Sequence, residues 1–106
     1  MRYVVETEFV FTEVINDIEY DQRISCPVKV SENTHPPYRT MLDAENALKE
    51  RVTFWRNRGY SGGVEITHSE KNGLRRAQSC LRRTKKPEQV CLKIEEREVS
   101  RTSLLH

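Results

Sequence analysis

The sequence of 106 residues lacks the features that mark membrane and secreted proteins. It has no apolar run near the roughly 18 residues that a membrane span requires. The segment from Met1 to Glu6 places a charged residue at each end of a short apolar run, where a secretory signal would have a long apolar stretch. We therefore expect a cytoplasmic protein with no membrane partner.

Cysteine and histidine are scarce and scattered. Cys26, Cys80 and Cys91 lack CxxC spacing, and thiols of this kind in a non-secreted protein are expected to be reduced and mostly buried. Zinc sites take their ligands in close pairs, whereas His35, His68, Cys80 and Cys91 lie far apart in the chain. The sequence therefore predicts no metal and no other cofactor.

Catalytic and nucleotide-binding motifs are also missing. There is no Gly-x-Ser-x-Gly elbow, no aromatic RNA-recognition motif and no GxxG loop of a KH domain. Segment 60–63 contains two glycines but lacks the Lys-Ser/Thr of a phosphate-binding loop. His68 next to Glu70 is an acid–base pair of a kind found in most chains. We therefore predict a protein without enzymatic activity and without a small-molecule substrate.

Charge is abundant and unevenly distributed, although the net charge is only +2. Residues 1–50 carry five basic and ten acidic side chains, and residues 51–106 carry thirteen basic and six acidic side chains. The hydrophobic fraction of 36% is enough for only a thin core. The sequence indicates a bipolar surface on a small folded domain.

The first 30 residues alternate between apolar and polar side chains, as half-buried strands do. The apolar positions are Tyr3, Val5, Phe9, Phe11, Ile15, Ile18, Tyr20, Ile24, Cys26, Val28 and Val30. Asn16 and Asp17 tolerate the backbone of a tight turn. This pattern predicts an antiparallel hairpin over 2–30, and Pro27 indicates an edge or a bulge in its second strand.

A helix is predicted over 40–58. Thr40 is a suitable N-cap with Asp43 three residues further on, and Gly59 is a suitable residue to end the helix. The expected core-facing stripe is formed by Met41, Ala44, Leu48, Val52 and Trp55.

The second half of the chain has one ambiguous segment. A short strand around Val64, Ile66 and His68 precedes Asn72-Gly73, which suits either a type I′ hairpin turn or the start of a second helix. Residues 74–82 do not alternate clearly, which favours the helix. A last strand is predicted over 89–99. The expected fold is a single α+β domain, 1–106, in the order ββαβαβ, with two helices on one face of a mostly antiparallel sheet.

The basic segment 71–86 has seven positive charges and no acid, and on a helix its arginines would form one cationic arc. Such an arc can neutralise phosphates, so we expect contact with nucleic acid or a nucleoprotein complex. The proposed contacts are Arg56, Arg58, Lys71, Arg75, Arg76, Arg82, Arg83, Lys85 and Lys86.

The acidic first half is a possible second partner surface. We expect it to comprise Glu6, Glu8, Glu19 and Asp21 on the hairpin, with the loop residues Tyr38 and Tyr60 as anchors. The alternative function is therefore a protein-binding regulator or inhibitor that occludes a larger enzyme, as small proteins of phage and mobile elements do.

Overall fold

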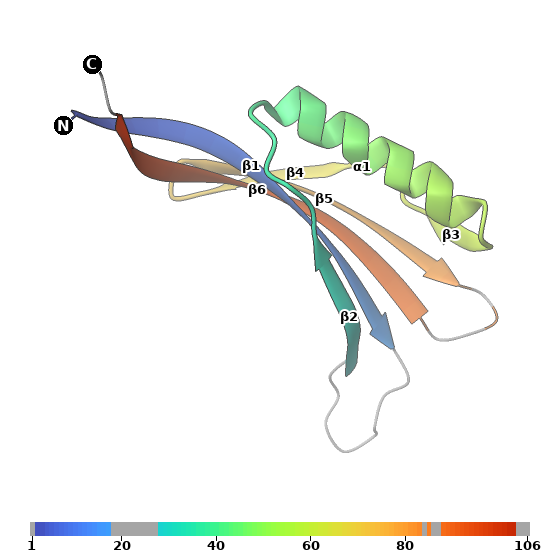
Figure 1. Cartoon of the computed structure of the whole chain (residues 1–106). Coiled ribbons are helices and arrows are strands. Elements are labelled where there is room, and N and C mark those ends of the chain that lie inside the picture. Colours follow the sequence, from blue (N-terminus) through green and yellow to red (C-terminus); the bar gives the residue numbers. More distant parts are fainter. Residues whose placement is uncertain (1, 18–27, 84, 86–87, 104–106) are drawn as a thin grey trace.

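A computed structural model describes residues 2–17, 28–83, 85 and 88–103. These residues form β1 (Arg2–Asp17), β2 (Val28–Thr34), α1 (Met41–Arg56), β3 (Tyr60–Gly62), β4 (Thr67–Lys71), β5 (Leu74–Arg83) and β6 (Glu88–Ser103) (Figure 1). All strand pairs are antiparallel, and the sheet order is β2-β1-β6-β5-β3. β4 also pairs with β5, so β3 and β4 follow one another along the outer edge of β5.

The prediction of an α+β fold with two helices in the order ββαβαβ is wrong, because the described chain is mostly antiparallel sheet with one helix. The segment expected to be the second helix is β5. Asn72 and Gly73 have φ angles of 54° and 77°, both positive as a type I′ turn requires. Ser79 obscured the alternation, since it is polar yet buried, and its hydroxyl donates a hydrogen bond to the Gly63 carbonyl (2.7 Å).

The N-terminal hairpin is partly as predicted. β1 does pair antiparallel with the next strand, β2. Asn16 and Asp17 are not the turn, however, because β1 continues through them and they pair with Lys29 and Val28. The predicted alternation over 18–27, including Pro27, lies outside the described residues.

The longest pairing in the sheet joins the two ends of the chain. β1 pairs with β6 without a register shift from Arg2↔Ser103 to Asp17↔Glu88. The last strand therefore extends beyond the predicted range 89–99 at both ends. No local pattern predicts this pairing, because antiparallel partners so far apart in sequence are selected by the whole fold.

The helix is close to its prediction. The Thr40 hydroxyl accepts a hydrogen bond from the Asp43 amide (3.1 Å), which confirms the N-cap. At the other end Gly59 has a φ of 92°, and its amide donates to the Arg56 carbonyl (3.1 Å). Glycine adopts this backbone without steric cost, so the chain can leave the helix and enter β3 directly.

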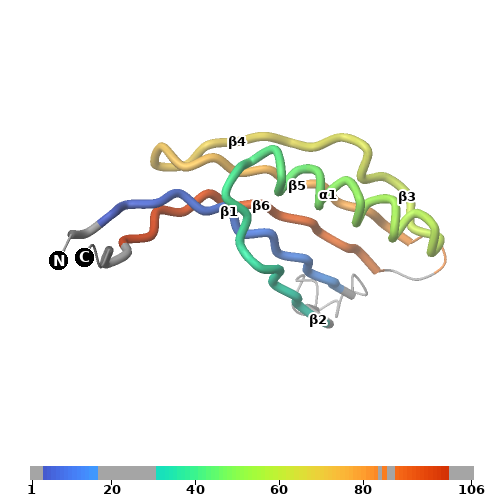
Figure 2. The backbone as a smooth tube through the Cα atoms, turned by 45° about the horizontal axis from the view of Figure 1, so that its top comes forward, coloured from blue at the N-terminus to red at the C-terminus, as the bar shows by residue number. Residues whose placement is uncertain are grey.

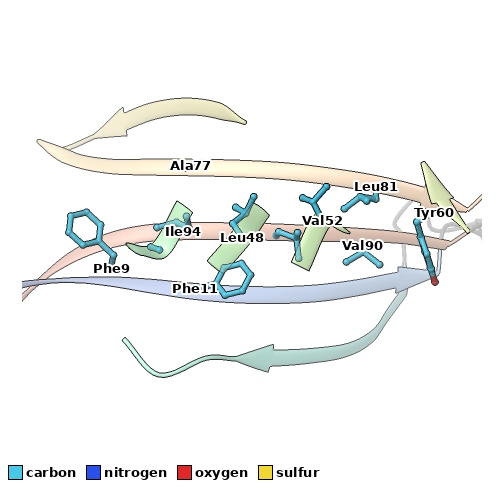
Figure 3. Packing of buried hydrophobic residues seen from close by; sticks show 11 residues of the cluster. Phe9, Phe11, Leu48, Val52, Tyr60, Ala77, Leu81, Val90 and Ile94 are labelled. Carbon is cyan, nitrogen blue, oxygen red and sulfur yellow. The ribbon is translucent and has the colours of Figure 1, made fainter. Parts of the chain in front are cut away.

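The core lies between α1 and one face of the sheet (Figure 3). Phe9 and Phe11 are buried as predicted, whereas Trp55 is only half-buried and packs edge-on against Tyr60 with ring centroids 5.1 Å apart. The buried residues of this layer are Phe9, Phe11, Ala44, Leu48, Val52, Tyr60, Ala77, Leu81, Val90, Leu92 and Ile94.

Beyond the helix, β1 and β6 continue as a two-stranded arm of residues 2–8 and 97–103 (Figures 1 and 2). β5 follows β6 only as far as the Arg76↔Glu95 pair. The arm exposes apolar surface, because Val4 is 41% and Val5 62% exposed. Two strands alone are marginally stable, so an exposed arm of this kind is a candidate contact surface.

Candidate functional site

Strand geometry divides the predicted cationic arc between two faces. Successive side chains of β5 point to opposite sides of the sheet. Arg75 and Arg83 therefore lie on the side of α1, whereas Arg76 and Arg82 lie on the opposite side, which no element of the described chain covers and which we call the open face. The prediction of one helical arc is wrong because it assumed a period of 3.6 residues where the period is two.

Part of the predicted basic surface nevertheless gathers at one end of the molecule. Arg82 and Arg83 pair with Ser61 and Tyr60 of β3, and the Arg56 Nη1 donates to the Gly62 carbonyl (3.2 Å). We call the exposed basic side chains at this end the cationic end. They are Arg56, Arg58, Arg82, Arg83 and Lys85.

Aromatic rings support two of these arginines. The guanidinium carbon of Arg58 lies 3.4 Å from the centroid of the Phe54 ring, and that of Arg83 lies 5.6 Å from the Tyr60 ring. Stacking of this kind limits the motion of a guanidinium while leaving its N–H groups accessible. The cationic end is therefore partly preorganised for an anionic ligand.

The remaining basic residues lie toward the opposite end of β5, where Arg75 and Arg76 are seven residues, or about 23 Å, from Arg82 and Arg83. Arg75 donates from Nε to Glu96 Oε2 (2.8 Å). Hydrogen bonding to Arg75 holds the pKa of the Glu96 carboxyl below its usual value. Lys71 is exposed next to the β4–β5 turn, and Arg76 is half-buried. Lys86 lies outside the described residues, so the structure brings together five of the nine predicted contacts.

The expectation that Tyr60 is a loop-borne anchor is wrong. Tyr60 is the first residue of β3 and is only 6% exposed, and its hydroxyl donates to the Glu88 carboxylate. Burial, reinforced by the neighbouring Glu88 charge, raises the pKa of Tyr60. Tyr60 therefore belongs to the core, where its ring packs near the Arg83 guanidinium of the cationic end.

Three residues of the predicted second surface do lie together. Glu6, Glu8 and Tyr38 line a surface cavity of about 460 Å³ along the outer edge of β1. Tyr38 exchanges two backbone hydrogen bonds with Phe9 (2.8 and 2.9 Å), and Glu8 accepts a hydrogen bond from Arg97 (3.1 Å). Glu19 and Asp21 lie outside the described residues.

A buried ion pair was not predicted. Glu13 is 4% exposed and accepts two hydrogen bonds from the Arg51 guanidinium, each 2.7 Å long. His35 stacks on Phe11 with its Nε2 4.0 Å from the Glu13 carboxylate. This pair joins α1 to β1, and only the register of two distant elements brings its members together.

Other described titratable side chains have partners on neighbouring elements. The ring of His68 bonds to Glu45 of α1 rather than to the neighbouring Glu70. In the part of the chain that the structure describes, no three potential metal ligands lie close together. Cys80 and Cys91, which are 11 residues apart in sequence, face each other across β5 and β6 with their sulfurs 2.9 Å apart.

Comparisons with protein-family models, curated proteins and solved structures find no match to this chain. Among the described residues, α1 does not have the length and apolar character that a membrane-spanning helix needs.

Proposed function

We propose that this chain is a non-enzymatic, cytoplasmic binding protein whose cationic end contacts the phosphate backbone of a nucleic acid, alone or within a nucleoprotein complex. The observation that carries the proposal is that five exposed basic side chains lie at one end of the molecule, at the end of α1 and on or just after β5, with Arg83 on the α1 side and Arg82 on the open face. The arrangement supports the proposal because cations that lie together can neutralise neighbouring phosphates and release counterions.

The surroundings of the cationic end favour phosphate contact over base readout. Tyr60 is buried and Phe54 lies under Arg58, so neither ring presents an open face on which a base can stack. Arginine also binds phosphate through two parallel hydrogen bonds. We expect little sequence preference and a steep dependence on salt, with a log–log slope of about −4.5 if five phosphates of duplex DNA are engaged.

The experiment is an anisotropy titration with labelled duplex DNA and single-stranded RNA at several salt concentrations. The variant Arg82→Gln/Lys85→Gln removes two charges from the cationic end. The matched control, Lys71→Gln/Arg76→Gln, removes two charges from the opposite end of β5. We expect only the first variant to reduce the magnitude of the salt slope, by about 2. Equal weakening by both variants, or no binding by the unmodified chain at low salt, contradicts the proposal.

A second candidate, a protein-binding regulator, is favoured by the outer edge of β1. Phe9 and Phe11 form backbone hydrogen bonds with Tyr38 and His35. The backbone N–H and C=O groups of the odd-numbered residues of β1 therefore point away from β6. The amides and carbonyls of Tyr3, Val5 and Thr7 therefore point out from this edge, along which no described strand pairs with them. An extended segment of a target protein could add to the sheet here.

This candidate is tested with a displayed library of extended peptides. Peptides selected on the unmodified chain should fail to bind Val5→Pro, which removes an outward-facing amide, and should still bind Val5→Thr, which keeps it. Peptides that bind both variants equally would refute strand addition at this edge. Reversing the charges of Arg82 and Lys85 should not affect binding of the selected peptides. This result would separate peptide binding from nucleic-acid binding.

A further inference from the structure

The strand register brings Cys80 and Cys91 into direct opposition. They are Cα partners in the β5–β6 pairing, and their sulfurs lie 2.9 Å apart. The backbone groups of the odd-numbered residues of β1 point away from β6, so the even-numbered residues form the backbone hydrogen bonds to β6. Val14 therefore exchanges its backbone hydrogen bonds with its partner Cys91. Toward β5, Cys91 is therefore in a non-hydrogen-bonded pair with Cys80.

A non-hydrogen-bonded pair is the closer of the two kinds of antiparallel pair, with Cα atoms about 4.5 Å apart. This separation lies within the range that a disulfide spans, about 4.4 to 6.8 Å. The two thiols can therefore bond without movement of either strand, and the backbone hydrogen bonds of β5 and β6 stay in place.

The surroundings make one of the two thiols accessible and reactive. Cys80 is half-buried on the open face, whereas Cys91 is 7% exposed. The hydrogen bond from Cys91 lowers the pKa of Cys80 to about 6, with smaller contributions from Gln78, Lys93 and Arg82, and the same contact together with burial raises the pKa of Cys91. Gln78 donates to the Cys80 sulfur at 3.2 Å.

We propose that Cys80 and Cys91 form a thiol pair that reacts with low-molecular-weight disulfides and closes to an intramolecular disulfide across β5 and β6. The Cys80 thiolate attacks one sulfur of the disulfide, which releases one thiolate and leaves a mixed disulfide on Cys80. Cys91 then loses its proton and attacks the Cys80 sulfur, and the second thiolate leaves. The two protein thiols are oxidised, and the small disulfide is reduced to two thiols.

The two charges nearest the thiol pair, Lys93 and Arg82, favour an anionic disulfide such as glutathione disulfide. Lys93 and Arg82 lie on the same face as the two sulfurs. Lys93 is two residues after Cys91 in β6, and Arg82 is two residues after Cys80 in β5. This reaction does not depend on the proposed binding function, since it uses the open face at the middle of β5.

The experiment treats the 106-residue chain carrying Cys26→Ser with glutathione disulfide, quenches with acid and measures intact mass. We expect the loss of two hydrogen atoms with no retained glutathione. The additional change Cys91→Ser should trap glutathione on Cys80 as a stable adduct. The change Cys80→Ser should leave a chain that reacts at least about tenfold more slowly, because its remaining thiol is buried and protonated.

Two results would overturn the proposal. One is accumulation of the glutathione adduct on the chain that has both thiols, which would mean that Cys91 does not reach the Cys80 sulfur. The other is formation of the internal disulfide at the same rate in the urea-unfolded chain, which would mean that the fold does not position the pair. If Cys91→Ser fails to fold, Cys91→Ala serves the same purpose.

Discussion

Replacing Arg51 with methionine should strongly destabilise the protein, because it removes two hydrogen bonds from a buried carboxylate and leaves, of its described partners, only the His35 ring, 4.0 Å away. The Glu13 side chain is 5% exposed and receives both of its hydrogen bonds from Arg51 at 2.7 Å. Methionine has a similar length and can cover the Phe54 ring, over which the Arg51 guanidinium lies at 3.9 Å. The change therefore removes the charge and preserves most of the packing.

The structure sets the size of the effect. Removing one member of a fully buried ion pair costs about 3 to 5 kcal/mol, since the other charge stays desolvated. The Arg51 side chain is 27% exposed, so water can reach part of the vacated space and the cost should lie near the lower limit, about 3 kcal/mol. With an m value of about 1.5 kcal/mol/M for a domain of this size, the midpoint of urea unfolding should fall by about 2 M.

Urea denaturation followed by Trp55 fluorescence measures this change. The control is Arg58→Met, because Arg58 also lies over Phe54 but at an exposed position, and it should cost less than about 1 kcal/mol. The double variant Glu13→Leu/Arg51→Met should recover most of the stability, since no unpaired charge is left. A loss below about 1 kcal/mol for Arg51→Met, or a double variant as unstable as the single one, would refute the reasoning.

Three further changes test the fold and the thiol pair. Leu81→Ala should cost about 2 to 5 kcal/mol in urea denaturation, because its side chain is fully buried. Gly73→Ala should lower the free energy of unfolding by about 1 kcal/mol solely through its backbone, since φ is 77° and no atom lies within 4 Å of the added methyl group. The rate of Cys80 alkylation by iodoacetamide should be half-maximal near pH 6, because a lowered pKa keeps the thiolate until the pH falls through that value. In Cys91→Ala, which removes the donor, the midpoint should move upward, and an unchanged midpoint would show that Cys91 does not stabilise the thiolate.

The elements that sequence reasoning identified correctly are governed by local interactions. The N-cap of α1 needs only Thr40 and the amide of Asp43, three residues apart, and the buried stripe of Ala44, Leu48 and Val52 follows from the helical period. The Asn72-Gly73 segment suited either a type I′ turn or the start of a helix, and the choice of the helix was wrong. A residue pattern predicts such features because the interacting groups are neighbours in the chain.

The error in β5 has an equally specific cause. A strand that is covered on one face should alternate, but Ser79 is buried through its hydrogen bond to Gly63, and Cys80 lies on the open face as a small, weakly polar side chain. These two residues removed the period-two signal from the middle of the strand. The basic side chains on both sides of them then fitted a helical wheel as well as a strand.

By itself the sequence determined the charge imbalance between the two halves and the position of α1, because each depends on composition or on neighbouring residues. Only the tertiary structure decided which charges act together. The pairing of the chain ends in β1 and β6, the Glu13–Arg51 ion pair, the division of the arginines between two faces and the opposition of Cys80 and Cys91 all follow from register. Register is selected by burial of the whole core, so no single segment contains the information that specifies it.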